Sequence, residues 1–183
     1  MNDQPSLRRR VLVFLAVFGL AVLADQGTKA WARDLPTHPD GCTLEKLADR
    51  RCVGLPQPVI SGYWEWELAM NDGAAFSNFR GGQLMLSAIA IGALILLGVM
   101  VVKTRPEEGV KRVALALIAG GALGNLIDRL SEGAVIDFVR WRIGEHRWPI
   151  FNVADVALVI GVLLLLCEGW LVRRRTPAAA AAA

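Results

Sequence analysis

The sequence has few of the residues that build metal centres and nucleophilic active sites. Only three of its 183 residues are cysteine and two are histidine, and no Cys/His pair has the spacing of a zinc site. Both histidines, His38 and His146, lie in segments that predict loops, so neither provides an evident base for Ser77 or Ser87. We therefore expect no metal, no cofactor and no serine nucleophile.

The composition also lacks the polarity of a soluble domain. Hydrophobic residues make up 54% of the chain and charged residues 20%, and the mean hydropathy is +0.42. Such values indicate an integral membrane protein. The net charge of +3 does not indicate a nucleic-acid partner, because no basic-aromatic recognition module is visible.

Four segments have the length of about 20 apolar residues that a membrane-spanning helix needs. They cover about residues 11–31, 84–102, 113–130 and 151–172. The first segment has the basic start and apolar core of a cleavable signal peptide. Because three further spans follow, we interpret it as a retained helix and predict an all-α fold with four transmembrane helices.

Basic residues beside the spans predict the orientation of the chain. Ten of the twenty Lys and Arg lie at three such sites: Arg8, Arg9 and Arg10; Lys103, Arg105, Lys111 and Arg112; and Arg173, Arg174 and Arg175. The positive-inside rule puts all three sites in the cytoplasm. We thus expect both termini inside, outer loops at about 33–82 and 131–150, one domain over 1–175 and a low-complexity tail at 176–183.

Two of the cysteines, Cys42 and Cys52, fall in the first predicted outer loop. An oxidising compartment permits a disulfide between them, although two free thiols in a variable insertion fit the sequence equally. Cys167 lies within the fourth span, where we interpret it as a small apolar filler.

The first span carries charge at its outer end. The apolar stretch from Val11 to Ala24 has 14 residues and covers about 21 Å at 1.5 Å per residue. The hydrocarbon core is about 30 Å thick, so Asp25 falls inside its outer part. Lys29 follows at i,i+4, on the same helix face, where the two side chains can pair. The second span has no ionisable residue.

The third span carries polar residues at the same depth. Its outer two turns contain Asn125, Asp128 and Arg129. Glycines at 120, 121 and 124 approach small-xxx-small spacing, which lets a neighbouring helix come close. Polar groups that share one depth in a membrane mark a functional site by default, although ion pairs Asp25–Lys29 and Asp128–Arg129 that only fix helix packing remain an alternative.

Two carboxylates converge where the third span ends and the fourth begins. Asp137 follows the third span, and the fourth span opens with Asn152 and Asp155 on one helix face at i,i+3. Two nearby carboxylates cannot both ionise cheaply, so they share a proton. One acid beside one base can activate a water and protonate a leaving amine, as in aspartic proteases. A small transporter or a non-catalytic assembly bundle with an outer polar network is the alternative reading.

Five ordered blocks resemble the lipoprotein signal peptidase family, signal peptidase II. They are "LADQGTK" (23–29), "NDGAAFS" (71–77), "GGALGNLIDRL" (120–130), "VIDFV" (135–139) and "FNVADVALVIGV" (151–162). The resemblance implies a membrane-embedded aspartyl endopeptidase of the bacterial inner membrane, with its active site at the extracytoplasmic face. It also implies removal of signal peptides from diacylglyceryl-modified prolipoproteins, with cleavage before the lipid-modified cysteine.

The resemblance also implies the roles of individual residues. The catalytic pair carries over to Asp137 and Asp155. Supporting or substrate-binding positions carry over to Asp25, Lys29, Asn71, Gly73, Asn125, Arg129, Asn152 and Ala154, and we add Asp128 from its place in the third span. The implied fold is a four-helix bundle with a small extracytoplasmic β-structure and a helical loop over the site. We expect a monomer whose partners are prolipoprotein substrates and membrane lipids.

Two segments of the first outer loop bear on this resemblance. The alternation around Tyr63, Trp64 and Trp66 predicts short strands at the membrane interface, the level that aromatic residues favour. Beyond these strands, we expect Asn71 and Gly73 to form a loop that holds a substrate backbone. The stretch from Thr37 to Pro56 looks longer than the family pattern suggests, and its role is open.

Overall fold

The computed structural model describes residues 7–37, 54–71, 73 and 82–175, of which 171–175 are described by their backbone alone. The helices in this part of the chain are α1 (Leu7–Ala32), α3 (Gln83–Val102), α4 (Gly109–Ser131) and α5 (Val153–Arg175). The strands are β1 (Gln57–Ile60), β2 (Trp64–Asn71), β3 (Val135–Ile143) and β4 (His146–Arg147). Each of the four helices is long and apolar enough to cross a membrane, which confirms the four predicted spans.

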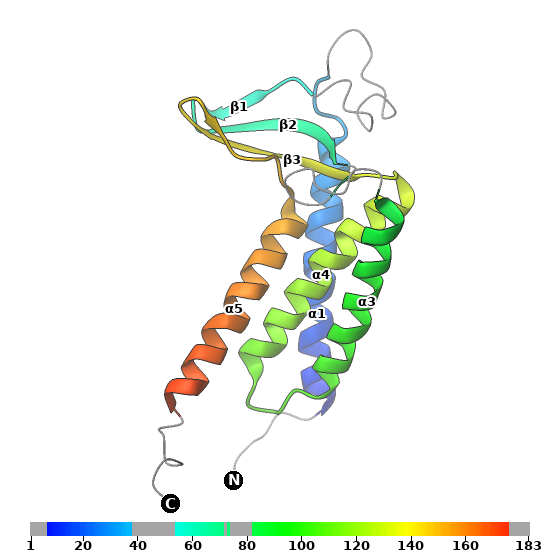
Figure 1. Cartoon of the computed structure of the whole chain (residues 1–183), viewed down its shortest axis with the longest axis vertical. Coiled ribbons are helices and arrows are strands. Elements are labelled where there is room, and N and C mark those ends of the chain that lie inside the picture. Colours follow the sequence, from blue (N-terminus) through cyan, green and yellow to red (C-terminus); the bar gives the residue numbers. More distant parts are fainter. Residues whose placement is uncertain (1–6, 38–53, 72, 74–81, 176–183) are drawn as a thin grey trace, which may run out of the picture.

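The four helices form a bundle in which α4 is the central helix. It packs against α1, α3 and α5, and Figure 1 shows it between α3 and α5. The most apolar window of α4 is 56% buried, against 6% for α1 and 17% for α3 and α5. The central helix is therefore the one that can carry polar side chains shielded from lipid on most sides.

The other helices expose large apolar side chains on their outer surfaces. Leu20 of α1, Leu84 of α3 and Leu166 of α5 are each more than 60% exposed. A soluble monomer rarely exposes so many apolar side chains on contiguous faces. In a bilayer these faces contact acyl chains at no hydration cost, so the exposure fits a membrane-embedded bundle.

A four-stranded antiparallel sheet, in the order β1-β2-β3-β4, lies across one end of the bundle (Figure 1). This confirms the predicted β-structure, although β2 begins at Trp64 and Tyr63 lies in the preceding turn. The pairing of β2 with β3 is irregular between Trp66 and Ala69, as at a β-bulge. Beyond the irregularity, Ala69 pairs with Asp137.

An aromatic cluster joins the sheet to the C-terminal end of α1. The ring of Trp31 in α1 meets Trp66 of β2 edge-on at 5.2 Å and Phe138 of β3 at 5.9 Å between centroids. Ile136 and Phe138, on either side of Asp137, are buried in the hydrophobic core against which Trp66 packs. Successive side chains of a strand point to opposite faces, so the cluster directs Asp137 the other way.

Glycines of α4 allow α1 and α5 to approach closely, as their spacing predicted. A Cβ on Gly120 would come within 2.7 Å of Ala21 Cβ in α1. A Cβ on Gly121 would collide with the backbone of Ala154 in α5, and one on Gly124 with the Asp25 carboxylate. The same small residues that let the helices pack thus leave space for a polar side chain between them.

Some predictions lie outside the described residues. Cys42 and Cys52 both fall there, while Cys167 is free and exposed on α5. The loop helix is not among the elements of the described part, so it stays a prediction. The fourth span was predicted from Phe151, but α5 begins at Val153, and this difference has a physical cause in the site.

Candidate active site

The N-terminus of α5 is closed by a reciprocal pair of hydrogen bonds between Asn152 and Asp155. The backbone N–H of Asp155 donates to Asn152 Oδ1 at 3.0 Å, and the backbone N–H of Asn152 donates to Asp155 Oδ2 at 3.2 Å. This is the geometry of a capping box, with Asp in the place usually taken by Glu. Asn152 is therefore the cap that precedes the helix, and Asp155 is fixed in its first turn.

The strand β3 places Asp137 beside that cap. Phe151 forms an isolated bridge with Val139, and its backbone N–H donates to Val139 O at 3.1 Å. This bridge holds the residue that follows, Asn152, against β3. The Asn152 side-chain amide donates to Asp137 Oδ1 at 2.7 Å and to Ile136 O at 3.2 Å.

Two asparagines connect the Asp137 and Asp155 carboxylates. Asn152 contacts both of them, as described above. Asn125 of α4 donates from Nδ2 to Asp155 Oδ1 at 2.9 Å and accepts from Asn152 Nδ2 at 3.0 Å. On the other side, Asn71 at the end of β2 donates to Asp137 Oδ2 at 3.1 Å. The structure thus brings together the two acids that the sequence analysis paired, at the sheet end of the bundle.

Burial, and after it the charge of Asp155, raises the pKa of the Asp137 carboxyl to about 8. Hydrogen bonds from Asn71 and Asn152 and the charge of Lys29 oppose this rise without cancelling it. Asp137 is only 2% exposed, so water cannot stabilise its charged form. Such a carboxyl holds its proton at neutral pH and can donate it.

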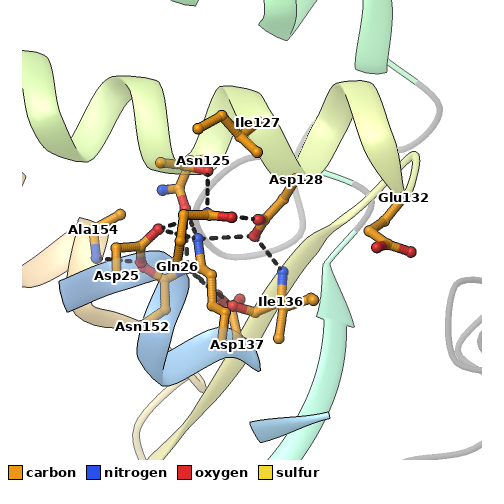
Figure 2. Close-up of polar contacts among 12 residues, drawn as sticks. Asp25, Gln26, Asn125, Ile127, Asp128, Glu132, Ile136, Asp137, Asn152 and Ala154 are labelled. Atoms are coloured by element: carbon orange, nitrogen blue, oxygen red, sulfur yellow. Dashed lines mark hydrogen bonds and ion pairs between the residues drawn. The ribbon is translucent and has the colours of Figure 1, made fainter. Parts of the chain in front are cut away.

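Behind the two acids lies a buried ion cluster centred on Lys29. Lys29 Nζ is 2.8 Å from Asp25 Oδ2 and 2.8 Å from Asp128 Oδ2, with all three side chains fully buried. It also donates to Asn125 Oδ1 at 2.9 Å. Figure 2 shows Asp25, Asn125 and Asp128 directed toward one centre between α1 and α4. Because Lys29 is only a donor, it fixes which end of the Asn125 amide faces Asp155.

The cluster also binds backbone groups of two further elements. Asp25 Oδ1 accepts from the backbone N–H of Ala154 at 2.9 Å, in the first turn of α5. Asp128 Oδ2 accepts from the backbone N–H of Ile136 in β3 at 3.1 Å. The carboxylates of α1 and α4 therefore anchor the two segments that carry Asp155 and Asp137.

Sequence reasoning missed Gln26, which binds the same cluster. Its Nε2 atom lies 3.1 Å from Asp25 Oδ2, 3.0 Å from Asp128 Oδ1 and 3.1 Å from Gly124 O. Figure 2 shows it beside the two carboxylates. The available signal was its place next to Asp25 within the "LADQGTK" block, but an uncharged amide did not stand out there.

The alternative reading in which Asp128 pairs with Arg129 is wrong. Asp128 forms its ion pair with Lys29, whereas Arg129 donates to the backbone oxygens of Gly73 at 3.3 Å and Asn125 at 3.4 Å. Adjacent residues of a helix point about 100° apart, so one faces the buried cluster and the other the loop after β2. Asn71 Oδ1 accepts from the Gly73 N–H at 3.1 Å, which shapes that loop.

Within the described residues, no group of three His, Cys, Asp or Glu side chains has the arrangement of a metal site. Between Asp25 and Asp128, where a cation would bind, the ammonium group of Lys29 is already in place. The absence of a metal cofactor stays a prediction.

Comparison with known proteins decides the family. The family model described as "Signal peptidase (SPase) II" matches residues 17–171. The chain belongs to the signal peptidase II family. It is a peptidase that removes signal peptides from prolipoproteins. The resemblance of the five sequence blocks is thereby confirmed.

Relatives of the peptidase cover nearly the whole chain. The lipoprotein signal peptidase of Xanthomonas campestris pv. campestris (strain 8004) is 37% identical over 168 residues, 89% of this chain and 90% of that protein. That of Xanthomonas axonopodis pv. citri (strain 306) is 39% identical over 168 residues, 89% and 87% of the two chains. A bacterial membrane enzyme solved by the in meso method has a TM-score of 0.71 at 29% identity, with 96% of this chain and 94% of that chain covered.

Proposed function

We propose that Asp137 and Asp155 are the catalytic pair of this peptidase. The observation that supports this most is the linkage of two carboxylates from different elements by the amides of Asn125 and Asn152. A packing role alone would pair each acid with a cation, as Lys29 does for Asp25 and Asp128. The pair Asp137 and Asp155 forms no ion pair among the described residues.

The proposed reaction is acid–base hydrolysis of the signal peptide bond. Ionised Asp155 takes a proton from a water molecule, whose oxygen attacks the scissile carbonyl carbon, while Asp137 gives its proton to the carbonyl oxygen. The resulting gem-diol collapses when the C–N bond breaks. Asp155 then protonates the leaving amine, and a gem-diol hydroxyl returns a proton to Asp137. The pair ends in its starting state, and no covalent intermediate forms.

The raised pKa of Asp137 supports these roles within the pair. A carboxyl with a pKa of about 8 is the acid at neutral pH. Asp155 accepts two N–H hydrogen bonds in a fixed geometry, from Asn125 and from the Asn152 backbone, which suits an ionised base. The other site residues support this pair by position: Asp25, Lys29, Asn71, Gly73, Asn125, Asp128, Arg129, Asn152 and Ala154.

The pH dependence of cleavage tests this assignment. Asp137 is protonated below its pKa of about 8 and loses the proton as the pH rises above it. Two ionised carboxylates leave no acid, so kcat/KM should fall about tenfold for each pH unit above 8. Thermal unfolding measured at each pH separates this fall from loss of the fold. A profile that stays flat to pH 10 would overturn the role of Asp137 as the acid.

We further propose that the substrate is the diacylglyceryl-modified prolipoprotein and that cleavage precedes its lipid-modified cysteine. In the predicted orientation, with both termini in the cytoplasm of a bacterium, the pair lies at the extracytoplasmic face of the inner membrane. The acyl chains can lie against the exposed apolar faces of the helices, which confines the scissile bond near the pair. Such positioning acts on the transition state as well as on binding.

Matched precursors with and without the diacylglyceryl group, presented in the same detergent, test the substrate proposal. We expect kcat/KM to be at least about tenfold lower for the unlipidated precursor. Without the positioning by the acyl chains, the activation free energy should rise by more than about 1.4 kcal/mol. A third precursor controls for partitioning into the micelle. It keeps the diacylglyceryl group on its cleavage-site cysteine but has a scrambled signal peptide. Equal rates for the matched precursors would contradict the proposed lipid specificity but not the proposed catalytic pair.

A further inference from the structure

At the end of the bundle opposite the sheet, two arginines converge on one loop. Arg10 of α1 donates from NH1 to Thr104 O at 3.0 Å, and Arg112 of α4 donates from NH2 to Arg105 O at 2.9 Å. The two acceptors are consecutive carbonyls of the loop that joins α3 to α4 (Figure 1). Guanidinium groups from two different helices thus bind adjacent residues of one loop.

Neither guanidinium is neutralised by a carboxylate in the part of the chain that the structure describes. Arg112 is only 4% exposed, and Arg10 is half-buried. The carboxylate of the nearby Glu108 binds other groups: it accepts from Lys111 Nζ at 3.0 Å and from the Arg105 N–H at 2.6 Å. Burying a charge without a counter-ion costs free energy, so a bound anion would stabilise this arrangement.

The surroundings of the two arginines add to the positive potential. Arg8, Lys103 and Arg105 are exposed at the same end of the bundle. The first turn of α4 contains no acidic residue, and its N-cap residue, Glu108, forms no side-chain capping bond. The acidic residues Glu107 and Glu108 precede this helix, so the positive potential at this end comes from the basic side chains rather than from the helix N-terminus.

We infer that Arg10 and Arg112 form a binding site for the phosphate group of an anionic phospholipid from the inner leaflet. A guanidinium matches the geometry of a phosphate with two parallel N–H donors. Basic clusters between helices at the cytoplasmic membrane surface attract anionic lipid headgroups. The inference uses the proposed orientation, in which this end faces the cytoplasm, but it does not depend on the catalytic pair.

Thermal unfolding of the purified full chain in detergent, with added phosphatidylglycerol or phosphatidylcholine, tests this site. We expect phosphatidylglycerol at about 100 times its Kd to raise Tm by about 5–10 °C, and phosphatidylcholine to have little effect. The double variant Arg10→Gln/Arg112→Gln should lose the difference between the two lipids. The matched control Arg8→Gln/Lys103→Gln, which removes the same charge from exposed positions, should keep it.

The single variant Arg10→Gln tests the site if the double variant does not fold. Arg10 is half-buried, so its replacement is milder, and the apparent affinity for phosphatidylglycerol should fall about tenfold. In phosphatidylcholine micelles this variant should cleave substrate at the parental rate, which separates the site from any failure of the catalytic pair.

Three results would overturn the inference. Equal stabilisation by both lipids would show that the headgroup charge is not recognised. Equal loss of the effect in the Arg8→Gln/Lys103→Gln control would indicate diffuse charge attraction. Inorganic phosphate that reproduces the Tm rise at millimolar concentration, and blocks the lipid effect, would identify a site for a free anion instead.

Discussion

Asp137→Asn and Asp155→Asn should each lower the rate of prolipoprotein cleavage by about 10³-fold or more while the protein still folds. Either change removes one partner of the proposed acid–base pair, and a positioned proton donor or acceptor contributes roughly 10²–10⁴-fold on its own. Because both proton transfers depend on the pair, the loss should lie toward the upper end of that range. The measurement is single-turnover cleavage by each purified variant.

The stability of these variants should change much less than their activity. Each carboxylate accepts two N–H hydrogen bonds, and an asparagine can accept only through its single oxygen. One donor then faces another donor, which costs about 1–3 kcal/mol. Both variants should therefore insert and unfold at a modestly lower temperature.

Glu67→Gln provides a matched control for both variants. Glu67 of β2 is also a buried carboxylate, 4% exposed, and its ion pair is with Arg140 of β3 rather than with a residue of the candidate site. The same carboxylate-to-amide change at this position should lower stability to a similar degree and leave cleavage nearly intact. If Asp137→Asn and Asp155→Asn retained as much activity as Glu67→Gln, the assignment of the catalytic pair would be wrong.

The gathering of polar residues at one end of the bundle was predictable from the sequence because it follows from counting residues along a helix. The count from Val11 to Asp25 and the position of Asp155 near the start of its span placed both acids at one level. In the structure, Asp25 and Asp155 belong to one polar network: Asp25 pairs with Lys29, Lys29 donates to Asn125, and Asn125 donates to Asp155.

Direction around the helix axis was not predictable in the same way. Spacing identifies neighbours within one helix, as it did for Asp25 and Lys29, but it does not say which cation of another helix reaches a carboxylate. The alternative that paired Asp128 with the adjacent Arg129 is therefore wrong, because the close packing at the α4 glycines brings Lys29 to Asp128. Gln26 was missed for the same reason, because its partners belong partly to α4.

The start of α5 shows a different limit of the sequence. Hydropathy extends the fourth span to Phe151, since a phenylalanine adds to the apolar run. The backbone of Phe151 instead pairs with β3, and the capping box of Asn152 and Asp155 sets the first helical residue at Val153. Asp155, a carboxylate that is costly to bury at the start of a membrane helix, is thus held by the helix terminus itself.

Lys29→Met should strongly destabilise the peptidase. Met keeps the length and apolar stem of the side chain but leaves the fully buried carboxylates of Asp25 and Asp128 without their shared cation. Breaking a buried ion pair from one side costs about 3–5 kcal/mol, so Tm should fall by about 6–20 °C in detergent. Cleavage should fall as well, because Lys29 fixes the Asn125 amide that binds Asp155.

Two further variants separate the buried cluster from a general effect of lysine removal. Lys103→Met removes the same charge from an exposed position at the opposite end of the bundle, and it should leave both Tm and cleavage near the parental values. Adding Asp25→Asn and Asp128→Asn to Lys29→Met removes the uncompensated charges and should recover part of the lost Tm, because neutral buried amides cost less than unpaired carboxylates. Activity should recover less than stability, since no ammonium group then orients Asn125. If Lys29→Met unfolded at the parental temperature, the cluster would not hold α1 and α4 together, and the anchoring of Ala154 and Ile136 through Asp25 and Asp128 would contribute little to the site.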